Sequence, residues 1–598
     1  MFWFVHALVL SLVMVGPATA VAAIGTSFKS VERTLLAGVG MFVFWTFMNW
    51  WVLYVMTPIV GFTSTSFYQS YGLYFLELIV TAIVLGMASY NDEKDFVSVG
   101  TVINALVLVC LVVFGLFWGT GGRIWTSGRA HTLRDLVSVK FEKPGAYPDT
   151  DPNHILMVSE QMADFKASTV LASNTQRNVG TYFKLGSGVL QSVDHHLYWL
   201  YLLKPNSWRQ AGKFHGHSIG YVVVDAEDPD VPARLKLGYE MRFFPGGFYD
   251  HSIGRHLYKN GYAGAKVTDI TLEVDDSWRP YFTAASDRLT LNFKRMVPGA
   301  MLLIDPQTGA IKKYSLHDIP SWVDRVYSAG TVKQMLNWWG EWAQAKHSFW
   351  NESSGNRYKV NRDPVLVYTK EGHPVWQAIM TSWNHSNAAA YLALFDARDN
   401  SARLYQVQNL TLENTAEQTI LGSGNNVKRL EPVHLSLHKI YGQLTWVAPL
   451  LAPGGSASDS VHTGAFQGLA LMRADDPNGN NVVFATNKDD ALSNYLQKLA
   501  AGDRNVANPE QNSNIKVVQG VVERVGLPIV QNGQTVISFI LTGDPNHEYQ
   551  EALTADSSPD LKYITAGAKV RFTFVDVGSS GPERTVSNFD DLSLHLGK

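Results

Sequence analysis

Cysteine and charge are both scarce in this chain of 598 residues. Its single cysteine, Cys110, excludes a disulfide scaffold and any zinc site built on several thiolates. Charged residues make up only 17% of the chain and apolar residues 46%, which argues against a disordered protein. The formal net charge of -3 provides no global basic field, so we expect no nucleic-acid partner.

Two common catalytic signatures are also missing from the sequence. It contains no phosphate-binding loop ending in Gly-Lys-Ser/Thr and no His-Glu-x-x-His zinc motif. Cys110 falls in an apolar run, where it cannot attack a soluble substrate. These absences leave an enzymatic function undecided but favour a non-enzymatic one, and we predict no cofactor.

The first 122 residues contain only three Lys or Arg and five Asp or Glu. Four apolar runs lie in this segment, and each approaches or exceeds the roughly 20 residues with which a helix crosses a bilayer. The runs are approximately Phe2–Ile24, Leu35–Phe62, Tyr71–Tyr90 and Val97–Trp118. We therefore predict a transmembrane head of about four α-helices over residues 1–122, and an integral protein of a bacterial inner membrane.

Three properties of this head stay open. The segment 16–20 resembles a signal-peptide cleavage site, but no basic residue precedes the first run, which favours its retention as a helix. Glu77 lies within the third run, where a carboxylate is a candidate ion or proton site, although a bond to a neighbouring helix is the commoner explanation. Basic residues after the fourth run favour a cytoplasmic C-terminal part. The Trp, Tyr, Asn and Gly content of that part, which lacks cysteine, favours the extracytoplasmic side, and we adopt the latter.

A pattern recurs four times between residues 156 and 500. Each copy has a strand that carries an aromatic residue, followed by an apolar run that ends in Asp and a turn. The aromatic strands are 197–201, 279–283, 373–377 and 444–448, and the acidic residues are Asp225, Asp305, Asp396 and the pair Asp475-Asp476. The pattern predicts antiparallel β units whose second strand is buried on both faces and whose Asp caps the turn. These Asp residues could instead be catalytic groups or calcium ligands, but no ladder of loop ligands accompanies them.

The remaining soluble sequence predicts two helices and a separate C-terminal module. Apolar residues at helical spacing predict helices at Ser321–Lys346 and Asp489–Ala500. Strands predicted at Ile515–Val525, Thr535–Leu541 and Ala568–Val575, with a turn at Asn532-Gly533, indicate a small OB-like β-barrel with an adaptor role. The predicted order is a connector (123–155), an α+β repeat domain (156–500), a polar linker (501–514) and the barrel (515–598).

The second unit contains Arg279-Pro280-Tyr281-Phe282 and the turn sequence Asp305-Pro306-Gln307-Thr308-Gly309. In these segments it resembles the PepSY-type repeat, a small α+β unit of bacterial envelope proteins. More broadly, residues 180–598, including segments 318–327 and 587–592, resemble an uncharacterised family of membrane-anchored proteins of bacteria and their mobile elements. These resemblances imply an architecture and an envelope location, and they supply no catalytic residues.

Several histidines fall within a stretch of about 60 residues that begins in the first unit. His215, His217, His251 and His256 could together form a metal site, because imidazoles held on a rigid scaffold bind zinc and similar ions. Their spacing matches no known signature, and loop histidines without a metal are the commoner explanation.

Three functions fit these patterns. The favoured one is a membrane-anchored scaffold or binding protein whose β units engage a partner in an envelope-associated complex. The alternatives are a metal-dependent hydrolase centred on the four histidines and a small transporter or channel that uses Glu77. The expected partners are the lipid bilayer, proteins of a membrane complex and a second copy of the chain.

Overall fold

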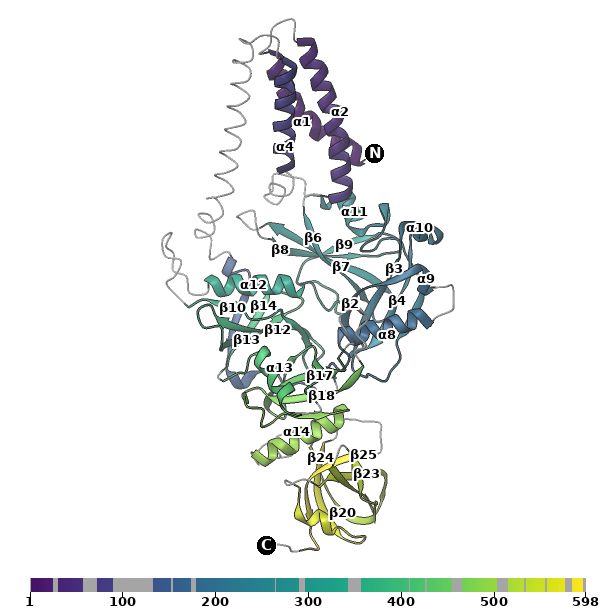
Figure 1. The fold of residues 1–598 in the computed structure, drawn as a ribbon, viewed down its shortest axis with the longest axis vertical. Coiled ribbons are helices and arrows are strands. Elements are labelled where there is room, and N and C mark those ends of the chain that lie inside the picture. The colour runs from purple at the N-terminus through teal and green to yellow at the C-terminus, as the bar shows by residue number, and fades with distance from the viewer. Residues whose placement is uncertain are drawn as a thin grey trace.

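The computed structural model describes residues 2–24, 31–57, 72–89, 133–151, 154–173, 179–263, 265–289, 296–342, 356–407, 409–424, 427–453, 465–502, 515–531, 534–553, 557–575 and 583–594. Its parts follow one another along one long axis (Figure 1). A helical bundle occupies one end, packed β-sheets with flanking helices fill the middle, and a small barrel occupies the other end.

The bundle is formed by three apolar helices that match the first three predicted runs. They are α1 (Phe2–Ile24), α2 (Val31–Met56) and α4 (Gly72–Ser89). By length and composition, two of them could cross a membrane, over Trp3–Ala20 and Val31–Val55. The apolar helical head is thus confirmed, while the fourth predicted run, Val97–Trp118, lies outside the described residues.

The first two β units each form a four-stranded antiparallel sheet. Unit 1 comprises α8 (Glu160–Ser173), α9 (Val179–Tyr182), β2 (Phe183–Val193), β3 (His196–Pro205), α10 (Trp208–Ala211), η5 (Gly212–Phe214), β4 (Ser218–Asp225) and β5 (Arg234–Met241). Unit 2 comprises β6 (Lys266–Val274), β7 (Pro280–Leu289), β8 (Met296–Ile304) and β9 (Ile311–Tyr314). Between the units lie η6 (Tyr249–His251), α11 (Ile253–Leu257) and η7 (Tyr258–Tyr262).

Units 3 and 4 repeat this plan with more strands. Unit 3 comprises α12 (Ala329–Trp342), β10 (Tyr358–Val360), β11 (Val365–Tyr368), β12 (Pro374–Ser382), β13 (Ala389–Asp396) and β14 (Ser401–Gln406). The predicted connector adds β1 (Ser138–Glu142), which pairs parallel to β14, and η2 (Pro144–Ala146). Unit 4 comprises α13 (Glu413–Gly422), β15 (Glu431–Pro432), β16 (Ser436–Ile440), β17 (Gln443–Leu451), β18 (Phe466–Arg473), β19 (Val483–Ala485) and α14 (Lys488–Gly502).

The units pack face to face in two pairs, as units that cannot bury their own faces must. Leu200 and Tyr221 of unit 1 share one core with Phe282 and Leu302 of unit 2. A second core joins unit 3 to unit 4 in the same way. All eight residues of β4 are buried, which confirms the prediction of a strand covered on both faces.

A buried glutamine bridges the two units within each pair. Gln191 in β2 donates to the carbonyl of Val274 at 2.8 Å and accepts from its N–H at 2.9 Å. Gln377 in β12 makes the same two bonds to Leu437, at 2.6 and 2.7 Å. Each side-chain amide thereby satisfies the backbone of a strand in the neighbouring unit, where an unpaired group would be costly.

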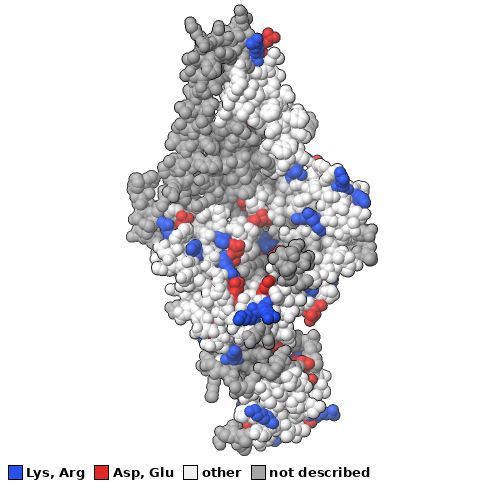
Figure 2. Space-filling model, viewed as in Figure 1, with Lys and Arg blue, Asp and Glu red and all other residues white. Residues whose placement is uncertain are grey.

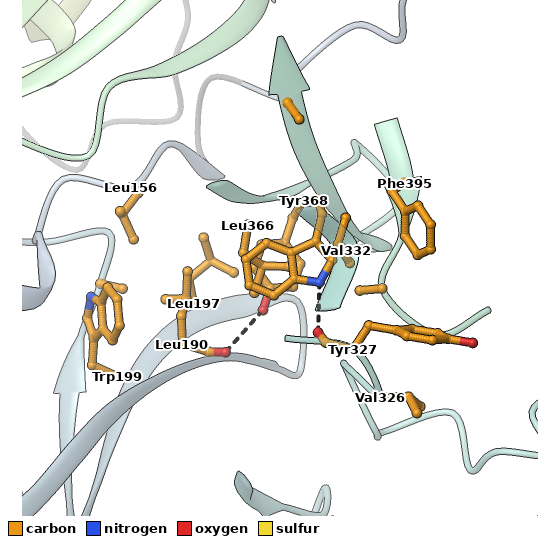
Figure 3. Packing of buried hydrophobic residues seen from close by; sticks show 14 of the residues in the cluster. Leu156, Leu190, Leu197, Trp199, Val326, Tyr327, Val332, Leu366, Tyr368 and Phe395 are labelled. Atoms are coloured by element: carbon orange, nitrogen blue, oxygen red, sulfur yellow. Dashed lines mark hydrogen bonds between the residues drawn. The ribbon is translucent and has the colours of Figure 1, made fainter. Parts of the chain in front are cut away.

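The two pairs meet in one large core (Figure 3). Trp199 and Leu197 of unit 1 lie on one side of it, and Phe395 and Tyr368 of unit 3 lie on the other. The indole of Trp376 donates to the carbonyl of Tyr327 at 2.9 Å within this core.

The predicted helix at Ser321–Lys346 begins eight residues late, because α12 starts at Ala329. The preceding residues use their backbone groups elsewhere: Val326 N–H donates to Ala397 at 2.8 Å, and the Trp322 carbonyl accepts from Gln191 at 3.2 Å. Tertiary contacts therefore override the helical spacing of the apolar residues. Helix α14, by contrast, matches the prediction within two residues at each end.

The C-terminal strands close into a five-stranded barrel, as predicted. The strands are β20 (Ile515–Val525), β22 (Gln534–Leu541), β23 (Asp544–Ala552), β24 (Lys569–Val575) and β25 (Glu583–Asp591), with β21 (Ile529–Gln531) beside β22 and η8 (Pro559–Tyr563) between β23 and β24. Around the barrel the order is β20-β22-β23-β25-β24, with β20 bonded to both β22 and β24. The predicted turn at Asn532-Gly533 lies outside the described residues.

Candidate functional site

The Asp that ends each apolar strand caps the following turn, as predicted. In the first three units, Oδ1 of Asp225, Asp305 or Asp396 accepts from the backbone N–H groups two and three residues later, at 2.8–3.3 Å. In unit 4, Asp476 Oδ2 accepts from the backbone N–H of Asn481 at 2.6 Å. These carboxylates are therefore occupied by local backbone donors.

The second oxygen of three of these carboxylates binds a histidine or arginine side chain, and we call these pairs the turn latches. They are His196–Asp225 at 2.8 Å, Arg279–Asp305 at 2.7 Å and His373–Asp396 at 2.5 Å. Each of these basic residues begins or directly precedes the neighbouring strand, β3, β7 or β12. Arginine does not release its proton in proteins, so in unit 2 the partner is a fixed cation and not an acid–base catalyst.

In unit 1 the latch continues through Glu227 to a second histidine. His196 Nδ1 lies 2.9 Å from Glu227 Oε2, and His154 Nδ1 lies 2.9 Å from the other oxygen, Oε1. Hydrogen bonds that its ring donates to Asp225 and Glu227 raise the pKa of His196 to about 9, so its imidazole is cationic at neutral pH. A general base needs a neutral imidazole, so this chain of contacts favours a structural role for His196.

Three of the four predicted metal ligands lie together. The ring centroids of His215 and His217 are 6.3 Å apart, and those of His217 and His251 are 5.4 Å apart with the rings edge to face. His251 Nδ1 lies 3.0 Å from the carbonyl of Arg242. Burial and then the neighbouring His251 lower the pKa of His217, so both oppose a charged ring.

His256 does not join these three rings. Its Nε2 lies 2.7 Å from the Gly309 carbonyl and its ring packs on Phe243 at 3.9 Å. Gly309 has a φ of +79°, and a Cβ there would come within 2.9 Å of His256, so the turn requires glycine. No group of three or more His, Cys, Asp or Glu within the described ranges is arranged to hold a metal ion. The metal site stays a prediction.

Two buried carboxyl groups meet where units 1, 2 and 3 join. Glu273 lies in β6, and Asp324 lies in the segment 318–327 that carries the family resemblance. The Asp324 N–H donates to Glu273 Oε2 at 2.9 Å. Asp324 Oδ2 accepts from the Ser192 N–H at 2.6 Å and from the Tyr368 hydroxyl at 2.7 Å. Asp324 thus ties three units together, through its side chain to units 1 and 3 and through its backbone N–H to unit 2.

Burial governs the charge of this acidic pair. It raises the pKa of Glu273 to about 8, with a further contribution from Asp324, and it raises the pKa of Asp324 to about 6. Glu273 therefore keeps its proton at neutral pH. Sequence reasoning missed the pair, because Glu273 and Asp324 are 51 residues apart and no local pattern links them.

Polar side chains from three helices meet inside the bundle. Asn49 Nδ2 in α2 donates to Ser11 Oγ in α1 at 3.0 Å and to Glu77 Oε2 in α4 at 3.1 Å. The Trp45 indole donates to Thr81 Oγ1 at 3.1 Å. Glu77 is fully buried, and its expected bond to a neighbouring helix is present.

The bundle joins the β units through residues between units 1 and 2, and we call this contact the docking interface. Its residues are Trp3, Tyr54, Arg255, Tyr258 and Lys259. Arg255 Nε donates to the Tyr54 carbonyl at 2.7 Å, and its guanidinium lies 4.4 Å from the Tyr54 ring centroid. Trp3 stacks on Tyr258 at 5.1 Å. Because Tyr54 lies in the last turn of α2, Arg255 caps carbonyls that lack helical partners.

Comparison with known proteins identifies no family for the chain. No family model matches it, and no curated protein matches it at a significant level. One solved structure, titled "Sialidase", shares 9% identity with it at a TM-score of 0.15, over 73% of this chain and 47% of that one. The chain thus spans about half the length of that structure, and the TM-score indicates no common fold.

Proposed function

We propose that this chain is an integral membrane protein whose β units form an arm that holds an OB-like barrel away from the bilayer and binds a protein partner of an envelope-associated complex. The observation that carries the proposal is an exposed apolar hairpin on the barrel, at the end of the molecule opposite the bundle (Figure 1). Two further observations support the proposal: the bundle has polar side chains inside and apolar ones outside, and it is attached to the arm by the docking interface.

The bundle has polar side chains inside and apolar side chains outside. Ser11, Asn49 and Glu77 are buried between its helices, whereas Phe47 and Leu36 are exposed by about two thirds. Charged residues mark the far tip of the bundle and the β units, and the described side of the bundle between them is uncharged (Figure 2). Lipid solvates such an apolar exterior, and water does not.

The order of the helices supports four crossings. The contacts Trp45–Thr81 and Asn49–Glu77 run in opposite residue order, so α4 is antiparallel to α2 and leads away from the docking interface. The described chain ends α4 at Ser89 and resumes at Leu133, which packs in the core of the β units on the side of that interface. The fourth apolar run, Val97–Trp118, lies within this interval and is long enough to cross a bilayer.

The barrel has the strand order and the parallel β23–β25 pair of an OB-like fold. Its β20–β22 connection presents Leu527 with 87% of its surface exposed and Val530 with 74%. Ile529, which lies between them, is also exposed. A contiguous apolar patch of this kind is typical of a protein-binding site. Helix α14 fixes the barrel to unit 4, because Ser493 donates to the Thr585 carbonyl at 3.2 Å.

The resemblance of unit 2 to PepSY repeats supports an extracytoplasmic arm. Its turn has the geometry that the Asp-Pro-x-Thr-Gly sequence is suited to form: Asp305 accepts from Gln307 and Thr308, and Gly309 adopts a positive φ. An arm of packed β units on the extracytoplasmic side of the membrane would serve an assembly or receptor complex of the envelope.

Site-specific photocrosslinking tests this proposal. A photoreactive amino acid at Leu527 or Val530 of the full chain is expected to capture one discrete protein in intact membranes. The matched control is the same amino acid at Asn546, an exposed polar residue of β23 on another hairpin. Equal capture from all three positions, or capture of lipid alone, would contradict a partner at the β20–β22 hairpin.

A further inference from the structure

Glu77 is a fully buried carboxyl group with an unused oxygen. Its Oε2 accepts from Asn49, while its Oε1 has no hydrogen-bond partner among the residues that the structure describes. Ser11, Asn49 and Glu77 come from three different helices and meet at one point. A neutral amide donor on one oxygen does not balance the charge of an ionised carboxylate in an apolar interior.

Among the residues that the structure describes, no basic side chain pairs with this carboxyl group. The first 122 residues contain only Lys29, Arg33 and Lys94 as basic side chains besides His6, and none of the apolar segments 35–62, 71–90 and 97–118 contains a basic residue. Arg33 lies 16 residues before Asn49 on α2, which is about 24 Å along the helix.

The charged groups nearest in the fold are also committed elsewhere or face outward. Arg255 donates to the carbonyls of Tyr54 and Tyr249, and Lys259 pairs with Asp250 at 2.7 Å. His6 lies at an exposed position of α1. On α2, Glu32 and Arg33 are exposed at the far end of the helix. None of these described groups balances the charge of Glu77, and a cation from solution can do so.

We propose that Glu77, supported by Asn49 and Ser11, is a proton-binding site inside the helical bundle. The carboxylate takes its proton from water, and the neutral acid then occupies the apolar interior without a counter-ion. A proton fits better than a metal cation, because Asn49 presents its amide nitrogen to both Ser11 and Glu77 and therefore donates where a metal ion would need ligand oxygens.

The site is positioned to influence the arm. Asn49 lies five residues before Tyr54, which is about 7.5 Å along α2 from the carbonyl that Arg255 caps. Leu53 lies between them and packs with Trp3 and Tyr258 in the docking interface. Along α2, the residue that bonds Glu77 is thus about one and a half helical turns from the residue that contacts the β units.

Labelling with dicyclohexylcarbodiimide tests the site in the full chain reconstituted in liposomes. This reagent adds to a protonated carboxylic acid: the acid proton moves to a carbodiimide nitrogen, the carboxyl oxygen bonds the central carbon, and rearrangement gives an N-acylurea that retains every atom. We expect one adduct at Glu77, with a labelling rate that falls about tenfold per pH unit above the pKa of the site. Glu77→Gln should abolish the adduct, and Glu32→Gln should leave it unchanged.

Three outcomes would overturn the proposal. Labelling of Glu77 that does not vary with pH would show that no titrating proton is present. Protection by sodium chloride, but not by potassium chloride, would assign the site to a metal cation. If the reagent fails to reach Glu77, infrared difference spectra decide: the carbonyl band of a protonated acid must be present in the native protein and missing in Glu77→Gln.

Discussion

The turn latch is the residue-scale device that recurs through the arm. Half of it was predictable from the sequence, because an Asp side chain bonds to backbone groups two and three residues ahead and the interaction is local. The histidine or arginine partner was not predictable, because it precedes the Asp by 29, 26 or 23 residues in the three units. Only folding of the sheet brings His196, Arg279 and His373 to the turns.

The latch in unit 1 leads to a prediction about pH. The pKa of His196 rises from 6.5 to about 9 in the folded chain, so its contribution to stability is complete below about pH 6.5 and is lost as pH rises through 9. His196→Ala should weaken the turn by about 0.5–1 kcal/mol at neutral pH, a modest value because 35% of the side chain is exposed. His196→Arg should keep the latch above pH 9.

Hydrogen exchange at the amides of Glu227 and Asp228 measures this effect, because both donate to Asp225. Exchange should accelerate in His196→Ala and stay near the native rate in His196→Arg, after correction for the intrinsic effect of pH. Faster exchange in both variants would mean that His196 acts through something other than its charge.

The buried acid Glu273 leads to a second prediction, with a larger expected change in the free energy of unfolding. Its pKa rises from 4.5 to about 8 on folding, so the folded chain binds more protons than the unfolded one between these values. The free energy of unfolding should therefore fall as pH rises through this window. Glu273→Gln, a neutral isostere, should remove the part of that slope that Glu273 contributes and stabilise the arm by roughly 1–3 kcal/mol at pH 9.

Unfolding temperatures of the full chain in detergent at pH 5, 7 and 9 check this result. At pH 5 the native protein and Glu273→Gln should differ little, since Glu273 is then protonated. Glu523→Gln, on an exposed strand of the barrel, serves as the control and should leave the pH profile unchanged. A native profile that is flat from pH 5 to 9 would contradict the assignment of a proton to Glu273.

At the scale of elements, predictions succeeded where one segment determines its own structure. The first apolar run and α1 have the same bounds, and the strand predicted at Ile515–Val525 is β20. Alternation or an unbroken apolar run is sufficient information for such segments. The helix at Ser321–Lys346 was wrong at its start because residues 322–327 bond to units 1 and 3, which local spacing cannot reveal.

A weakened docking interface should be easy to detect, because one side chain, Arg255, makes several of its contacts. Arg255→Ala removes two hydrogen bonds to carbonyls, of Tyr54 and Tyr249, and should weaken the attachment by about 1.5–3 kcal/mol. We expect faster hydrogen exchange in residues 249–263 and in the last turn of α2, with the barrel unchanged. Arg255→Lys should give an intermediate result, because it keeps the charge without the fork of donors.

Arg209→Ala is the matched control for this experiment, because Arg209 is an exposed arginine of α10 in unit 1, outside the docking interface. It should leave exchange in residues 249–263 at the native rate. If Arg255→Ala does the same, the interface is held by the stacking of Trp3 on Tyr258 and not by the cap on α2.

At the scale of the whole molecule, the sequence separated the apolar head from the soluble arm but did not give their arrangement. Composition shows the separation, because the charge density changes sharply after residue 122. The gathering of His215, His217 and His251 was only partly foreseeable: proximity in sequence suggested four partners, and the fold directed His256 to the turn of unit 2. The acidic pair and the docking interface depend on contacts between distant segments, and no local pattern marks them.

The helix order makes a prediction about topology that involves the entire chain. Trp3 and Tyr54 both contact the arm, so the start of α1 and the end of α2 lie on the same side of the membrane as the barrel. Glu32, at the start of α2, must then lie on the opposite side. In a protein freed of its native thiol by Cys110→Ser, Glu32→Cys and Tyr563→Cys provide one reporter for each side, since both side chains are exposed.

A membrane-impermeant maleimide applied to intact and to opened spheroplasts should modify the two reporters under opposite conditions. An N-terminal tag should be cleaved by external protease under the same condition that permits modification of Tyr563→Cys. Modification of Tyr563→Cys in intact spheroplasts would place the arm outside, as the PepSY-like turn predicts, and modification only after opening would place it in the cytoplasm. Modification of both reporters under one condition would contradict the crossing of α2 itself, and with it the assignment of the bundle to the membrane.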